Sequence, residues 1–396
     1  MFDRVIFKNQ AGYGPLIDIG ALAEALLFYG HVSIVGNTGT LRYLLGKIPP
    51  LIFLQLIRSK RITFYYTVDS VAIQTNTREG HLPLHGLITY SSPQHTIERT
   101  PSDIFYELSN DKFAARRFSK AVQSIDHGLF DQTAVIETFC NHDLTENAVT
   151  AVVTSLTPNY SQQDKIRFRV ERESKGFVID TNIDFELLNQ EYHLFVPKKH
   201  SSLTPAYLLS LFQTTHEDLY FAGQLDSEVA VSELGRQVQQ VTVGSLLGNR
   251  FQSESQIEAF ESLTLESCYT IREAINSGKV SFSEIVKLLD KADKFRDWLH
   301  DQPPDVEIIN RYYQATVENT WVEKLPSKSV RWGIFTTAGL GIDLMGAGGL
   351  GTAAGIGLSA VDTFVLDKII GGWKPHHFVE GNLKPLLKND NSNEKD

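Results

Sequence analysis

The stretch from residue 331 to residue 375 reads RWGIFTTAGLGIDLMGAGGLGTAAGIGLSAVDTFVLDKIIGGWKP, and we expect the rest of the chain to be organised around it. Its central 18 residues, 344–361, carry no charge and include six glycines. Each glycine inside a helix costs about 1 kcal/mol relative to alanine, so a helix here needs close packing in compensation. We therefore predict a Gly-rich apolar helical segment over residues 331–378.

Small residues recur in this segment at every fourth position. In a helix that spacing forms a smooth ridge, on which a second backbone can approach closely. Asp343 lies on the same ridge, which favours a ridge that faces protein or water over one that faces lipid. Trp332 and Trp373 bracket the segment, as interfacial aromatic residues do. The small residues of the ridge are Gly339, Ala347, Gly351, Gly355, Ser359 and Thr363.

Two environments fit the segment. A helix needs roughly 20 apolar residues to cross a bilayer, so the uncharged run is marginal for a single short span; the other geometry is a helical hairpin of the longer segment that turns near residues 346–349. The alternative is a Gly/Ala-rich helix pair buried in a soluble protein or at an oligomer interface. We favour membrane association, by conditional insertion rather than by a constitutive anchor. Membrane lipid, and either a protein partner or a second copy of the chain, are the expected partners of the segment.

Length and composition set the limits for the remainder. At 396 residues the chain is long enough for two or three domains. Cys140 and Cys268 form no metal or redox spacing, which fits a reduced cytosol. The first ten residues lack the pattern of a signal peptide. We expect a cytoplasmic protein that can be recruited to the inner face of a membrane.

Charge is unevenly distributed along the chain. Residues 1–120 carry 13 Lys/Arg and 9 Asp/Glu, giving +4, whereas the remainder carries 24 and 38, giving −14. A mildly basic N-terminal part can face an anionic surface, although a solvated mixture of charges is the plainer interpretation. No aromatic platform interrupts the basic clusters, which disfavours nucleic acid as a partner. These clusters are Arg58, Lys60 and Arg61, then Lys112, Arg116, Arg117 and Lys120.

Residues 1–200 predict an α+β region of one or two subdomains. Alternating β-branched and aromatic residues indicate strands, and amphipathic runs indicate helices. Expected strands include 5–7, 31–35 and 134–139, with hairpins at 62–75, turning at 69–70, and at 166–183, turning at 174–176; expected helices include 21–29, 38–45, 112–125 and 146–156.

An antiparallel α-helical unit is predicted over residues 201–330. Ser253-x-x-Gln256 and Ser281-x-x-Glu284 are capping boxes that begin two of its helices, and residues 306–322 suit a third. The Gly-rich segment follows this unit, and residues 379–396 are expected to form a polar tail.

The sequence contains no catalytic motif, which favours a role other than that of an enzyme, and we expect no cofactor or metal. Gly346–Gly351 matches GxGxxG, but no later strand follows to complete a nucleotide-binding unit. Residues 35–40, VGNTGT, are similar to a strand–loop–helix phosphate cradle without the Lys of a P-loop, and an N-cap at Thr38 or Thr40 explains them adequately.

The histidine and cysteine motifs are weaker. His81 and His85 have Pro83 between them, which argues against a metal pair on one helix. The runs at 140–143 and 216–218 combine Cys, His, Asp and Glu, but each stands alone in the sequence.

Four features of the C-terminal quarter resemble uncharacterised bacterial proteins that end in a glycine zipper and are sometimes encoded in phage-defence loci. They are Phe295-x-x-Trp298-Leu299, Leu325-Pro-Ser-Lys328, the zipper itself and Gly372-Trp-Lys-Pro375. The resemblance implies a membrane-directed role in bacterial antiviral defence. Two hypotheses follow from the sequence: a cytosolic sensor, adaptor or effector with a membrane-active C-terminal segment, and a soluble oligomeric scaffold whose zipper is a packed core or interface.

Overall fold

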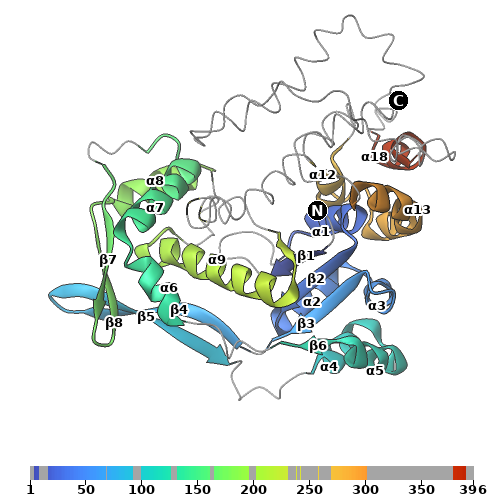
Figure 1. The fold of residues 1–396 in the computed structure, drawn as a ribbon, viewed down its shortest axis with the longest axis horizontal. Coiled ribbons are helices and arrows are strands. Elements are labelled where there is room, and N and C mark those ends of the chain that lie inside the picture. Colours follow the sequence, from blue (N-terminus) through green and yellow to red (C-terminus); the bar gives the residue numbers. More distant parts are fainter. Residues whose placement is uncertain are drawn as a thin grey trace, which may run out of the picture. The chain divides into compact units, whose positions relative to one another are not determined.

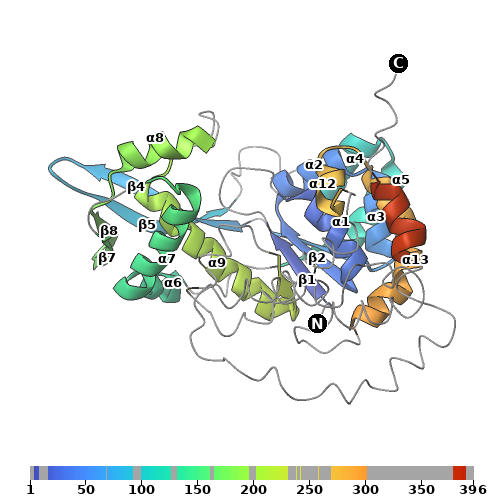
Figure 2. The ribbon, with the colours of Figure 1, turned by 90° about the horizontal axis from the view of Figure 1, so that it is seen from above.

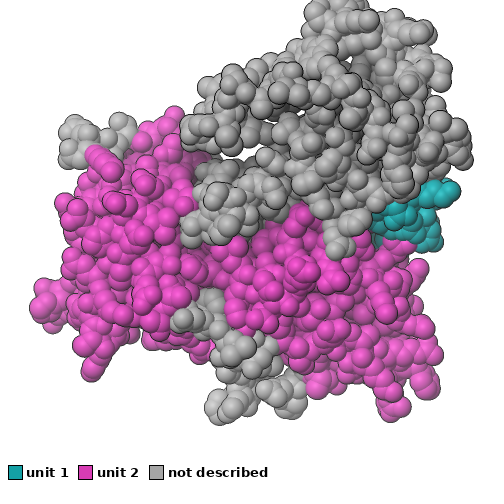
Figure 3. All heavy atoms as spheres, viewed as in Figure 1, with its two compact units in different colours: residues 1–2, 249–396 teal, residues 3–248 magenta. Residues whose placement is uncertain are grey.

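A computed structural model describes the chain in two compact units, Asp3–Gly248 and Asn249–Asp396 with Met1–Phe2 (Figure 3). Each unit is presented by itself below. The described residues are 4–8, 17–67, 69–91, 100–125, 132–160, 165–195, 202–230, 269–300 and 378–388, with the single positions Val238, Val241 and Ile257.

A five-stranded parallel sheet forms one half of the first unit (Figure 1). Its spatial order is β6-β3-β2-β1-β9, so the strand order reverses at β1, which has β2 on one side and β9 on the other. Short buried apolar runs explain the three central strands, because both faces of a parallel sheet are covered by helices. The strands are β1 (Arg4–Lys8), β2 (His31–Gly36), β3 (Ile62–Tyr66), β6 (Gln123–Ser124) and β9 (Glu228–Val229).

Helices cover both faces of this sheet (Figure 2). On one face Phe53 contacts Phe64 of β3 and Phe118, with ring centroids 6.3 and 6.1 Å apart. On the other face Val35 of β2 packs with Phe221 of the long helix α9 (Pro205–Leu225). Strands β1, β2, β3 and β6 follow one another across the sheet, so the right-handed connections that parallel strands almost always have put the helices between them on the same face. The helices on the first face are α1 (Ile19–Phe28), α2 (Thr38–Lys47), α3 (Pro50–Arg58), α4 (Pro101–Ser109) and α5 (Lys112–Ala121).

The other half of the unit contains an antiparallel sheet of order β4-β5-β8-β7. Phe139 lies at the centre of its core, 5.6 Å from Phe177 of β8 and 6.2 Å from Phe212 of α9, measured between ring centroids. The strands are β4 (Asp69–Arg78), β5 (His81–Ser91), β7 (Phe168–Glu173) and β8 (Gly176–Thr181), and the helices besides α9 are α6 (Gln132–Phe139), α7 (His142–Leu156) and α8 (Phe185–Phe195).

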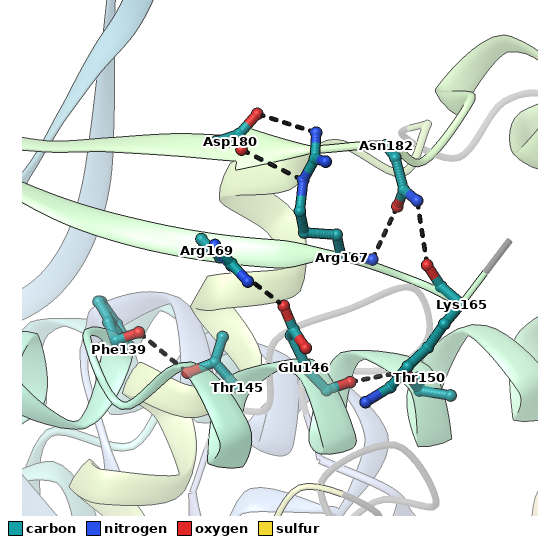
Figure 4. Close-up of polar contacts among 9 residues, drawn as sticks. All are labelled: Phe139, Thr145, Glu146, Thr150, Lys165, Arg167, Arg169, Asp180 and Asn182. Carbon is teal, nitrogen blue, oxygen red and sulfur yellow. Dashed lines mark hydrogen bonds and ion pairs between the residues drawn. The ribbon is translucent and has the colours of Figure 1, made fainter.

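Polar contacts hold the β7–β8 hairpin in register and attach it to α7 (Figure 4). Arg167 Nε lies 3.2 Å from Asp180 Oδ2, and Arg169 Nε lies 3.6 Å from Glu146 Oε1 of α7. The side-chain oxygen of Asn182 accepts a 2.7 Å hydrogen bond from the backbone amide of Arg167. Exposed ion pairs contribute about 0–1 kcal/mol each, so the aromatic core supplies most of the stability here.

The second unit packs two helices, α12 (Ile271–Asn276) and α13 (Phe282–His300), with η2 (Val379–Leu383) and α18 (Lys384–Leu387). Phe295 stacks on Phe378 with ring centroids 5.2 Å apart, and the amide of Tyr269 donates to the carbonyl of Leu387. The Ser281 capping box is confirmed, because Glu284 Oε2 accepts from the backbone amide and hydroxyl of Ser281 at 2.8 and 2.7 Å.

The predicted α+β character of the N-terminal region is confirmed, and two local predictions within it are wrong. Residues 62–75 form no hairpin, because β3 pairs in parallel with β2 and β4 pairs with β5 in the other sheet. Residues 134–139 belong to helix α6, in which Val135 and Phe139 are four positions apart and both buried. Helical spacing into a core has overridden the β-propensity of that run.

The limits of the predicted regions also differ from the structure. Helix α9 and strand β9 lie beyond the boundary expected at residue 200, and both belong to the first unit. Residues 379–387, expected in a polar tail, are helical and bury Val379, Leu383 and Leu387 at four-residue spacing. The predicted helix over 306–322, the capping box at Ser253 and residues 331–377 of the Gly-rich segment lie outside the described residues.

Candidate functional site

The carboxyl ends of the parallel strands form the most informative edge of the first unit. Lys8, Gly36 and Tyr66 end β1, β2 and β3 there, in adjacent positions of the sheet. In open α/β sheets, ligands bind outside the carboxyl ends of the strands at the point where the strand order reverses. That point lies at β1 in this sheet.

The turn from β2 into α2 is tight at this edge. Asn37 is the N-cap, and its side-chain oxygen accepts hydrogen bonds from the amide of Thr40 at 3.1 Å and from its hydroxyl at 3.3 Å. A Cβ on Gly36 would lie 2.6 Å from the Thr40 side chain, so glycine is required for the turn to close. Among the described residues, the amides of Thr38 and Gly39 donate to no protein acceptor.

Two hydroxyl groups meet beside these amides. The hydroxyl oxygens of Thr38 and Tyr66 lie 2.7 Å apart, which links the first residue of α2 to the last residue of β3. Both side chains are half-buried. Free amides at a helix N-terminus attract anions, and neighbouring hydroxyls add donors. The β2–α2 turn therefore has the chemistry of a phosphate or carboxylate site.

A buried ion cluster lies at the end of β1. Lys8 Nζ is 2.6 Å from Glu217 Oε2 and 3.6 Å from Asp218 Oδ1 of α9. The side chains of Lys8, Glu217 and Asp218 are only 11%, 7% and 6% exposed. Gln213, one turn earlier on α9, donates a 2.7 Å hydrogen bond to the second oxygen of Glu217.

The cluster perturbs the pKa values of its members. Burial acts to lower the pKa of Lys8, but attraction by Glu217 and Asp218 overrides burial and raises the pKa above 10.5. Burial is the main reason that the pKa of Asp218 rises from 3.8 to about 7, against the lowering effect of Lys8. Perturbed pKa values are common at functional sites, because burial and charge pairing both shift a pKa and prepare the group to bind a ligand.

Helix α9 joins this cluster to both sheets (Figures 1 and 2). Its first half contributes Leu208 and Phe212 to the core of the antiparallel half, and Phe221 near its end packs on the parallel sheet. The ion cluster lies between these two contacts. The Nε2 atom of His216, beside it, is buried without a hydrogen-bond partner among the described residues, and burial lowers the pKa of this histidine.

Other titratable groups in the described part of the chain have structural surroundings. Within it, no group of three or more His, Cys, Asp or Glu residues is arranged to hold a metal ion. Burial raises the pKa of the Cys140 thiol, which keeps it in the less nucleophilic protonated form. His85 stacks on Phe177 at 5.7 Å and exchanges a 3.0 Å hydrogen bond with Thr75.

Some of the sequence motifs lie within the described residues, and others lie outside them. The strand–loop–helix context of residues 35–40 is present, but Asn37 rather than Thr38 or Thr40 is the N-cap. Glu217 and Asp218 lie next to Lys8, a partner that no local sequence pattern predicts. Two adjacent acids inside a largely apolar helix were the signal that could have indicated burial. The predicted membrane-packing residues lie outside the described residues: Gly339, Asp343, Ala347, Gly351, Gly355, Ser359, Trp332 and Trp373.

Comparisons with protein-family models, with curated proteins and with solved structures give no match. Among the described helices none is by itself long and apolar enough to cross a membrane, and α2 with α3 passes that test only as a pair bent by 109°.

Proposed function

We propose that the protein is a ligand-responsive sensor that acts at a membrane. The first unit binds a phosphate-bearing small molecule, of the size of a nucleotide, at the carboxyl edge of its parallel sheet. One observation carries this proposal: the β2–α2 turn presents two amides that donate to no acceptor among the described residues, and the paired hydroxyls of Thr38 and Tyr66, beside the reversal of strand order.

Helix α9 is the element through which binding would be transmitted. It packs on the strands of both sheets, and its buried charges contact the last residue of β1. A ligand at that edge changes the local charge and hydration next to Lys8, Glu217 and Asp218. The equilibrium between two positions of α9 then depends on the ligand, as population shift requires.

The response is delivered by the Gly-rich segment of residues 331–378. Its uncharged length and its ridge of small residues support conditional membrane insertion and helix association. The resemblance of residues 280–380 to bacterial zipper proteins supports a role for this response in antiviral defence. If the segment instead packs in an oligomer core, the chain is a soluble scaffold that binds no lipid, and vesicle binding separates the two.

Gly39→Asp tests the ligand site without disturbing the fold. A carboxylate in the first turn of α2 stabilises the helix by about 0.3–1 kcal/mol, but it repels an incoming phosphate. A Cβ here would lie 3.3 Å from the Asn37 side-chain oxygen and meets nothing else within 4 Å. We expect the variant to fold normally and to bind its ligand at least about tenfold more weakly, or about 1.4 kcal/mol.

The measurement is the thermal shift of the full chain with ATP, ADP, NAD⁺, cyclic AMP and inorganic phosphate. Gly46→Asp is the matched control, because Gly46 is on the same helix, away from the edge, with nothing within 4 Å of an added Cβ. The control should keep the wild-type shift. The proposal fails if none of these compounds stabilises the wild type, or if Gly39→Asp and Gly46→Asp respond equally.

A further inference from the structure

An open groove of about 460 Å³ lies between α3 and α5, on the helical face of the parallel sheet. We call it the α3–α5 groove. Its lining combines apolar and cationic side chains. The residues that matter here are Leu51, Gln55 and Arg58 of α3 with Phe113 and Arg117 of α5.

Two large apolar side chains of this groove face the solvent. Phe113 is 77% exposed and Leu51 is 58% exposed. The neighbours of Phe113 on α5 show that the helix itself is well packed, since Ala114, Ala115 and Phe118 are buried. An exposed apolar pair on a rigid, well-packed pair of helices is a feature of interaction surfaces.

Cations surround the apolar pair. Arg58 and Arg117 line the groove, and Lys112, Arg116 and Lys120 are exposed on α5. Within the described part of the chain, none of these five cations forms an ion pair, whereas Arg42 of α2 pairs with Glu107 at 2.9 Å.

One acid, Asp111, lines the groove, and its single negative charge is outnumbered by these five cations. Asp111 is the N-cap of α5, and one of its carboxylate oxygens accepts hydrogen bonds of 2.9 Å from the amides of both Phe113 and Ala114. The carboxylate is therefore engaged by the helix that carries the cations. The groove keeps an excess of positive charge, in a chain whose net charge is −10.

We propose that the α3–α5 groove is a docking surface for an anionic lipid bilayer. Phe113 and Leu51 enter the boundary between headgroups and acyl chains, and the arginines and lysines contact lipid phosphates. Leu51 favours lipid over nucleic acid, because a leucine offers a nucleic acid no stacking surface, whereas the headgroup–acyl boundary accommodates both Leu51 and Phe113. This inference rests on the membrane role proposed above, but residues far from the Gly-rich segment carry it.

Flotation of the full chain with vesicles tests the docking surface. We compare phosphatidylcholine vesicles with vesicles that also contain phosphatidylglycerol, and we expect tighter binding to the latter that weakens as salt is added. Each basic residue near an anionic surface strengthens binding roughly fivefold, so Arg58→Glu with Arg117→Glu should weaken it at least about tenfold. Phe113→Ser should also weaken binding, without lowering the melting temperature.

Matched controls separate this surface from general charge and exposure. Lys165→Glu with Lys175→Glu makes the same charge change at two exposed positions of the antiparallel half. Leu194→Ser removes an apolar side chain that is 70% exposed on α8. Both controls should bind phosphatidylglycerol vesicles as the wild type does.

Three results would overturn the docking surface: equal binding to both kinds of vesicle, equal loss in the test and control variants, or binding of duplex DNA in place of vesicles. Gly351→Leu distinguishes this failure from failure of the Gly-rich segment. If Gly351→Leu alters vesicle association and the groove variants do not, the proposed membrane role stands and the docking surface is wrong.

Discussion

Replacing Lys8 with Met is expected to lower the free energy of unfolding by about 3–5 kcal/mol at neutral to alkaline pH, because it leaves two buried carboxyl groups without their cation. Lys8 Nζ lies 2.6 Å from Glu217 Oε2 and 3.6 Å from Asp218 Oδ1, and each of the three side chains is at most 11% exposed. Met fills a similar volume, so lost packing contributes little to the effect. Equilibrium urea unfolding of the full chain measures it.

The stability of the wild type should depend on pH through Asp218. Its pKa is about 7 in the folded protein against an ordinary value of 3.8, so between these values the folded state holds a proton that the unfolded state has lost. This group therefore contributes stability that falls as the pH rises from about 4 to about 7 and stays low above that range. Lys8 has a raised pKa, so its contribution is complete below 10.5 and is lost only as the pH rises further.

Two companion variants test the roles of the carboxyl groups. Asp218→Asn should remove the decline between about pH 4 and pH 7, since an amide does not titrate. Adding Glu217→Gln and Asp218→Asn to Lys8→Met removes the unpaired carboxylates and should recover most of the lost stability. An unchanged unfolding midpoint for Lys8→Met at pH 8 would show that the cluster is not buried as described.

Gly176→Ala should be the second severe substitution, with a cost of about 2–5 kcal/mol from strain and overlap together. Gly176 has φ of +149°, and a Cβ there would lie 2.0 Å from the backbone carbonyl oxygen of His85. Backbone atoms cannot move aside cheaply, and His85 is the β5 residue that pairs with Phe177 of β8. The substitution therefore strains the junction between the two hairpins of the antiparallel sheet.

Gly80→Ala is the control for Gly176→Ala. Gly80 also has a positive φ, +71°, but nothing lies within 4 Å of an added Cβ. Its cost should be only the backbone penalty of about 1–2 kcal/mol. The same loss of unfolding free energy in both variants would contradict the close approach of Gly176 to His85.

Local sequence signals predicted much of the first unit correctly. The β-branched run of β2, the amphipathic pattern of α5 and the turn between β7 and β8 each depend on residues close together in the chain. The Ser281 capping box is local in the same sense, and the structure confirms it. Hydrophobic spacing and capping chemistry act over a few residues, so a single sequence reveals them.

Pairing between distant segments could not be predicted in this way. Lys8 and Glu217 are separated by 209 positions, and no sequence pattern near either residue indicates that the two form an ion pair. The order of the parallel sheet could not be predicted for the same reason. Its edge strand β9 has only two residues, and it pairs with β1, which lies near the start of the chain. The expected hairpin at 62–75 failed for this reason: two adjacent strand-forming runs belong to different sheets.

In the proposed function, a ligand at the carboxyl edge of the parallel sheet controls action at a membrane. The most direct test is flotation of the full chain with phosphatidylglycerol-containing vesicles, in the presence and absence of ATP, ADP, NAD⁺ or cyclic AMP. We expect at least one of these ligands to change the floated fraction for the wild type and for Gly46→Asp, and to have no effect on Gly39→Asp. A floated fraction that no ligand changes, or that changes equally in all three proteins, would show that the edge does not control membrane binding.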